Sequence, residues 1–177
     1  MKKELLLGVL MLCCSMAIQA QTYYYNESKT FKMLGYTYKC DNELYVTLYN
    51  INNEFTNSTE KYTTTGEIFT MRNGVSPLES DHWTKHKCYS IVNNAFTADE
   101  KLRCKGEKLI IRVYINSQTG RIKEVQYHFL SEAPFATIPV STYRKIETEL
   151  KENVWFVPTA EGKKLNFIFL AWAQEPK

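Results

Sequence analysis

The sequence is poor in residues that interrupt regular structure, with only 7 Gly and 5 Pro in 177 residues. So few chain-breaking residues exclude a collagen-like chain and a low-complexity disordered chain. Charged residues make up only 23% and the formal net charge is +3, which gives no electrostatic basis for nucleic-acid binding. Apolar residues make up 44% and aromatic residues 14%, which is typical of a globular protein with one core.

The short motifs of common cofactor sites are also missing. The sequence has no Gly-x-Gly-x-x-Gly, no P-loop and no Cys-x-x-Cys. His82, His86 and Cys88 are the candidate metal ligands, but on a helix Cys88 lies about 200° around the axis from His86. We therefore expect a solvated helix face there, no metal and no cofactor.

Catalytic residues are equally hard to find. His128 alternates with Glu124 and Gln126 along a predicted strand, and a His/carboxylate pair can serve as a general base. No pattern places a Ser or Cys nucleophile beside them, and no Gly-rich elbow surrounds any Ser. We expect these side chains to be solvated and the protein not to be an enzyme.

The N-terminus has the three parts of a secretory signal peptide. Met1-Lys2-Lys3 is positive, residues 5–18 form an apolar run, and Ala20 suits the position before the cut. The run is shorter than the ~20 residues of a membrane-spanning helix. We expect cleavage after residue 20, no transmembrane segment afterwards, and export to the periplasm or outside of a Gram-negative bacterium. An uncleaved anchor is the alternative.

Cleavage would leave three cysteines, Cys40, Cys88 and Cys104. Three cysteines permit at most one internal disulfide. Cys88 and Cys104 are nearest in sequence, so the alternatives are a bridge between these two or three free, buried thiols.

The hydrophobic patterns from residue 21 to 177 predict one α+β domain with an N-terminal half (21–106) and a C-terminal half (107–177). We expect an antiparallel sheet built from hairpins with two or three helices packed on it, ending in a β-β-α-β unit. The expected strands are a hairpin over 31–50 turning at 40–43, a possible strand at 66–71, a hairpin over 109–115 and 121–130, and a final strand at 164–172. The expected helices are 80–96, capped by Ser80 or Asp81, a short one from the capping box at Thr97, and 141–152, capped by Ser141.

Two core predictions follow from these patterns. Cys88, Ile91 and Val92 begin an apolar stripe at helical spacing, so Ile91→Asp should leave the protein insoluble. The final strand is apolar on both faces, which is typical of a central, doubly covered strand. On that interpretation Phe169→Asp should be among the most destabilising substitutions.

Four tyrosines of the first hairpin are the candidate binding residues: Tyr36, Tyr38, Tyr45 and Tyr49. We expect them on the face opposite to Val46 and Leu48, which should point to the core. An exposed aromatic face would suit a glycan or a protein partner. The alternative is that the rings are covered and serve core or cross-strand packing.

The stretch from 109 to 172 resembles the C-terminal domain of TonB-type proteins. The resemblance rests on "IIRVYINSQTGRIKEVQYHF", "STYRKIETEL" and "VWFVPTAEGKK", in which Phe156, Pro158, Ala160 and Gly162 match the family pattern. It implies a periplasmic interaction module rather than an enzyme. The whole chain also resembles small exported Bacteroidetes proteins of unknown function, through "AIQAQ" and "GKKLNFIFLAW".

These observations predict a non-enzymatic exported protein that binds an unknown envelope protein or glycan. Two alternatives remain at this point. One is a small secreted hydrolase that uses His128, and the other is a secreted inhibitor whose loops, such as 52–65, carry recognition.

Overall fold

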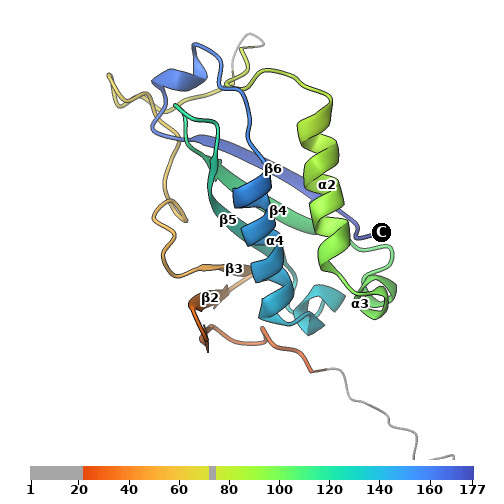
Figure 1. Ribbon diagram of the computed structural model, residues 1–177. Helices are drawn as coiled ribbons and strands as arrows, with labels where there is room; N and C mark the ends of the chain where they lie inside the picture. The colour runs from red at the N-terminus through yellow and green to blue at the C-terminus, as the bar shows by residue number, and fades with distance from the viewer. Residues whose placement is uncertain (1–21, 72–74) are drawn as a thin grey trace, which may run out of the picture.

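The computed structural model describes residues 22–71 and 75–177. Its centre is a six-stranded antiparallel sheet with the strand order β1-β2-β3-β5-β4-β6 (Figure 1). The strands are β1 (Lys29–Met33), β2 (Tyr36–Asn42), β3 (Val46–Asn50), β4 (Leu109–Ile115), β5 (Ile122–Phe129) and β6 (Ile168–Gln174). The helices are α2 (Trp83–Ala95), α3 (Ala98–Arg103) and α4 (Val140–Asn153). The predicted α+β fold is therefore confirmed, whereas the predicted signal peptide lies outside the described residues.

Helices α2 and α4 lie side by side on one face of the sheet (Figure 1). The predicted stripe of α2 is buried there, including Cys88, Ile91 and Val92. Asp81 caps α2, because its carboxylate accepts hydrogen bonds from the Trp83 and Thr84 amides at 3.0 and 2.6 Å. The amphipathic periodicity thus identified the buried face of this helix correctly.

The shorter helix and α4 begin differently from one another. Helix α3 has the predicted capping box, in which the Thr97 and Glu100 side chains each bond the other's backbone amide. The prediction that Ser141 caps α4 is wrong. Helix α4 begins at Val140, directly after Pro139, and no side chain caps it.

The turn between β4 and β5 fixes the segment that follows α4. Gly120 has φ of 70°, and its carbonyl accepts a hydrogen bond from the Phe156 amide at 2.9 Å. Arg121 and Trp155 form an isolated antiparallel bridge beside it. This tether holds residues 154–158 in extended conformation against the sheet.

Three strand predictions need correction. The expected two-stranded hairpin over 31–50 consists of three strands, because β1 pairs with β2 and β2 pairs with β3. The segment 66–71 is not a strand, since its only pairing is an isolated bridge between Ile68 and Lys61. The last strand begins at Ile168 and lies at the edge of the sheet, not at its centre. The strand is apolar on both faces for another reason than a central position. On the face away from the helices, Phe169 packs against Tyr114 with 5.6 Å between the ring centroids.

The second face of the sheet is partly covered by the segment after β3. The amides of Glu54 and Phe55 donate to the Glu124 carboxylate at 2.8 and 2.9 Å, and the Tyr114 hydroxyl donates to the Thr56 carbonyl at 3.3 Å. Glu124 and the two polar residues that alternate with it, Gln126 and His128, are consequently buried. The expectation that they are solvated is wrong, because a segment without regular structure covers this face and its amides satisfy the Glu124 carboxylate.

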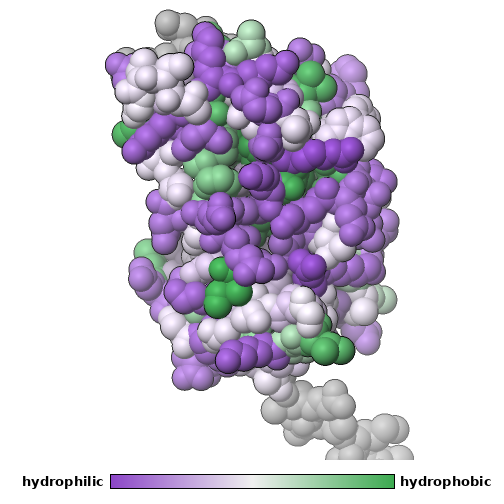
Figure 2. Space-filling view, turned by 60° about the vertical axis from the view of Figure 1, so that its left-hand side comes forward, coloured by the Kyte–Doolittle hydropathy of each residue, from purple (hydrophilic) through white to green (hydrophobic). Residues whose placement is uncertain are grey.

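The side of the molecule that carries residues 50–70 is mainly hydrophilic, with hydrophobic side chains exposed in small separate groups (Figure 2). Within 22–71 and 75–177, none of the helices is both long and apolar enough to cross a membrane.

Candidate functional site

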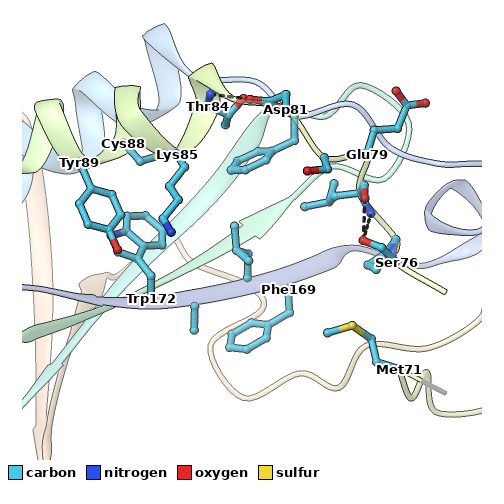
Figure 3. Close-up of a pocket in the computed structure, with 16 residues that line it drawn as sticks. Met71, Ser76, Glu79, Asp81, Thr84, Lys85, Cys88, Tyr89, Phe169 and Trp172 are labelled. Atoms are coloured by element: carbon cyan, nitrogen blue, oxygen red, sulfur yellow. Dashed lines mark hydrogen bonds between the residues drawn. The ribbon is translucent and has the colours of Figure 1, made fainter. Parts of the chain in front are cut away.

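A groove lies between the N-terminal half of α2 and the edge strand β6 (Figure 3), and its volume is about 570 Å³. Its lining is mostly apolar and includes the segment 76–81. Six of the residues that line the groove are Leu78, Lys85, Tyr89, Phe156, Leu170 and Trp172. This volume lies within the ~300–1,000 Å³ typical of ligand sites. We call this cavity the α2–β6 groove.

The outer edge of β6 is open beside this groove. Phe169 pairs with Tyr114 of β4, yet its amide donates to the Glu60 carboxylate at 3.0 Å, so the amide points away from β4. The N–H and C=O groups of successive residues in a strand point alternately to its two sides. The amides and carbonyls of Ala171 and Ala173 therefore point outward, as those of Phe169 do. Both alanines are exposed, and in the described chain β6 pairs only with β4.

The two edges of the sheet differ in their protection. The opposite edge strand, β1, carries Lys29 and Lys32, and charged side chains are a common means of preventing unwanted strand pairing. From Phe169 to Gln174 the β6 edge has no charged residue. On the β6 edge the Glu60 carboxylate engages the Phe169 amide, and the part of the edge at Ala171 and Ala173 stays available for pairing.

The charged side chains around the groove are unequally engaged. Both carboxylate oxygens of Asp81 accept hydrogen bonds, including one from the Thr84 hydroxyl at 2.6 Å. Desolvation acts against ionisation, but these bonds from Thr84 and Trp83 lower the pKa of Asp81 below its usual value. Lys85 lies over the Tyr89 ring at 5.8 Å and reaches from α2 toward Trp172 (Figure 3). Within the described residues Lys85 forms no ion pair.

The four predicted tyrosines do not share a face. Tyr38 lies on the helix side of the sheet and is fully buried, and Tyr36 is two residues away on the same side. Tyr49 lies on the other side, where its hydroxyl donates to Asp41 at 2.7 Å, and Tyr45 is 50% exposed before β3 begins.

The cause of this error is the position of the turn. The pairs Cys40–Leu48 and Asn42–Val46 place it at residues 43–45, not at the predicted 40–43. A shift of register by an odd number of residues moves a strand's side chains to the opposite face. The predicted four-tyrosine binding surface is therefore not formed.

The other sequence candidates are not brought together either. His128 contacts Thr47 Oγ1 at 3.2 Å and Gln126 Oε1 at 3.4 Å, and burial together with Arg112 lowers the pKa of His128 to about 4. His82, directly before α2, and His86 on α2 are exposed, while Cys88 is buried. In the part of the chain that the structure describes, no three His, Cys, Asp or Glu side chains are grouped to hold a metal ion.

The cysteines of the described chain are all unpaired and buried. Burial raises the pKa of the Cys40 thiol to about 11 and those of Cys88 and Cys104 to about 12. Of the two alternatives for the cysteines, the structure has the three free thiols. The raised pKa values keep these thiols protonated, and a protonated thiol is a poor nucleophile.

Sequence reasoning missed Lys85, Trp172 and the open edge of β6. The uncharged run from Phe169 to Gln174 was visible, but it fits a central strand equally well. Only the strand order distinguishes the two positions.

The fold and groove define a class: an α+β protein with an antiparallel sheet, two helices on one face, and an apolar groove beside an unprotected edge. Residues 21–172 match the family model described as a domain of unknown function, DUF5043, and the chain belongs to that family. A solved structure of a DUF5043 family protein from Bacteroides uniformis is 36% identical, with a TM-score of 0.85. The alignment covers 88% of this chain and 89% of that chain.

No curated protein matches the chain significantly. The family model spans both predicted halves, and the resemblance of the C-terminal half to TonB-type domains is not confirmed.

Proposed function

We propose that this protein is an exported, non-enzymatic binding protein of the cell envelope that takes up an extended polypeptide segment in the α2–β6 groove. The observation that carries the proposal is the open β6 edge lying directly beside an apolar cavity. Other recognition domains bind peptides in this way, by adding a strand to a sheet edge next to a helix.

The chemistry of the edge favours a polypeptide over other ligands. Ala171 and Ala173 each present one outward amide and one outward carbonyl, which alternate at the spacing of another β-strand. The small alanine side chains leave the edge accessible. A bound strand would satisfy these groups, while its helix-side residues would enter the groove beside Leu170 and Trp172.

The absence of catalysis is part of this proposal. Asp81 is held by the α2 amides, and the Cys88 thiol has a raised pKa, so neither group is prepared for acid–base or nucleophilic work. Export rests on the signal-like N-terminus, with its positive start, apolar run and Ala20. Expression of the full chain in a Gram-negative host, followed by N-terminal sequencing of the product, tests the cut after Ala20.

The binding proposal is tested with Ala173→Pro. Proline removes the outward amide and is tolerated at an edge position that does not pair inward. Ala173→Ser is the matched control because it keeps the amide. A displayed library of random peptides would be selected on the wild-type protein, and the enriched peptides tested on both variants.

We expect the enriched peptides to bind the wild-type protein and the Ala173→Ser variant and to lose binding to the Ala173→Pro variant. Circular dichroism of all three proteins should show the same fold. The proposal fails if no peptide is enriched, or if the selected peptides bind the folded Ala173→Pro variant as strongly as the wild type.

Glycan binding is a second candidate, favoured by a different observation. Trp83 and Trp155 are 42% and 45% exposed with ring centroids 4.8 Å apart, and the Arg121 guanidinium lies 4.9 Å from the Trp155 ring. Exposed indole rings provide stacking surfaces for sugar rings. A glycan array would test it: binding should be lost in Trp155→Ala and unaffected by Ala173→Pro.

A further inference from the structure

We infer that the polypeptide segment bound in the α2–β6 groove carries an acidic side chain that pairs with Lys85. This inference rests on the proposed function and adds the chemistry of the ligand to it. It starts from the direction of the Lys85 side chain, which extends from α2 toward Trp172 of β6 (Figure 3).

The groove contains one positive charge, the ammonium group of Lys85. Lys85 forms no ion pair among the residues that the structure describes. Asp81, one turn earlier, is already engaged by the Trp83 and Thr84 amides and the Thr84 hydroxyl. The carboxylate of Glu79 points away from Lys85 and Trp172 in Figure 3. A ligand in the groove therefore meets a free ammonium group.

Strand addition would change the surroundings of this amine. In the open groove water solvates Lys85, but a strand placed between α2 and β6 would displace part of that water. A desolvated ammonium without a counter-charge is costly, whereas a ligand carboxylate would compensate it and exclude strands that lack one. Charge complementarity thus selects an acidic residue at the position that faces Lys85.

The spacing along the bound strand follows from its geometry. Residues that face the helices are two apart, or about 6.6 Å along the strand. The apolar lining around Leu78, Phe156 and Leu170 is suited to a large apolar side chain. The expected pattern is therefore an acidic residue and a large apolar residue separated by one residue.

The test uses the displayed peptide library on the wild-type protein and on Lys85→Glu. Lys85 is exposed, so this change should leave the fold intact, which a melting curve checks. We expect acidic residues to be enriched at one position with the wild type and basic residues at the same position with Lys85→Glu. A wild-type-selected peptide should bind Lys85→Glu at least ~10-fold more weakly, and its Asp→Asn or Glu→Gln version should bind the wild type similarly weakly.

The outcomes separate the inference from the proposed function. Peptides that bind the wild type, fail on Ala173→Pro, yet show no acidic preference and no response to Lys85→Glu would overturn the pairing and leave strand addition standing. A library that yields no peptide at all would overturn both. A second copy of the protein occupying the edge, seen as a dimer that Ala173→Pro dissociates, would also refute an acidic peptide as the occupant.

Discussion

The hydroxyl of Tyr38 on β2 donates a hydrogen bond to the carboxylate of Glu147 on α4, so two residues 109 positions apart are joined across the core. The Glu147 side chain is fully buried and is also paired with Arg144 at 3.0 Å and Lys151 at 3.1 Å. Burial by itself would raise the pKa of Glu147. The Tyr38 bond, together with Lys151 and Arg144, outweighs it and holds this pKa below its usual value.

We predict that Tyr38→Phe destabilises the protein by about 1.5–3 kcal/mol. The phenylalanine would leave a buried, ionised carboxylate with one donor fewer, and hydrogen bonds to charged groups contribute in this range. Urea unfolding measures the change. Tyr36→Phe is the control, since Tyr36 is on the same face and half-buried; a loss as large as that of Tyr38→Phe would contradict the assignment.

Acid should destabilise the protein through His128. Burial and Arg112 lower the pKa of His128 from 6.5 to about 4, so the unfolded state binds a proton that the folded state does not bind. Stability should therefore fall as the pH drops from 6.5 toward 4, by on the order of 3 kcal/mol. His128→Gln should flatten this part of the profile. The further loss at lower pH, where Glu147 is protonated, should persist in the variant, and an unchanged slope above pH 4 would refute the role of His128.

Gly120 and Gly35 provide a matched comparison of two left-handed glycines. A Cβ on Gly120 would lie 1.8 Å from the Phe156 carbonyl oxygen, whereas a Cβ on Gly35 meets nothing within 4 Å. Gly35→Ala should cost only its backbone strain, roughly 1–2 kcal/mol. Gly120→Ala adds a steric clash with backbone and should cost about 3 kcal/mol or more. Thermal melts of the two variants decide the matter, and equal losses would mean that the Phe156 tether is not rigid.

Ile91 and Phe169 should respond differently to aspartate. Ile91 is 7% exposed within the core, so Ile91→Asp buries an unpaired charge and should leave the protein insoluble. Phe169 is 38% exposed at an edge, so Phe169→Asp should cost only about 1–2 kcal/mol, against the expectation from its apolar pattern. Soluble yield and melting temperature compare them. A soluble, normally melting Ile91→Asp protein would refute the buried position of α2.

Sequence signals predicted the structure correctly where they depend on contacts between residues that are close together in the chain. The stripe of α2, the capping box at Thr97 and the hairpin at Gly120 each depend on neighbours within one turn. The error at Ser141 is also local: an eligible capping residue was present, but Pro139 already sets the backbone for the helix start.

The candidate site was not predictable in the same way. The edge position of β6 depends on which strands pair across the whole chain, and its apolar pattern is compatible with either position. The prediction that the four tyrosines share a face was wrong for Tyr36 and Tyr38, because the turn lies at 43–45 and this register places both on the helix side of the sheet.

By itself, the sequence determined the α+β class, the hairpin of β4 and β5 and the buried face of α2, because periodicity, turn residues and capping act through short-range contacts. Tertiary structure alone decided the strand order, the burial of Glu124, Gln126 and His128, and the groove between α2 and β6. The physical reason is that a strand's side chains alternate identically at the centre and at the edge of a sheet. Only its neighbours decide whether its outer hydrogen-bonding groups are satisfied or remain available to a partner.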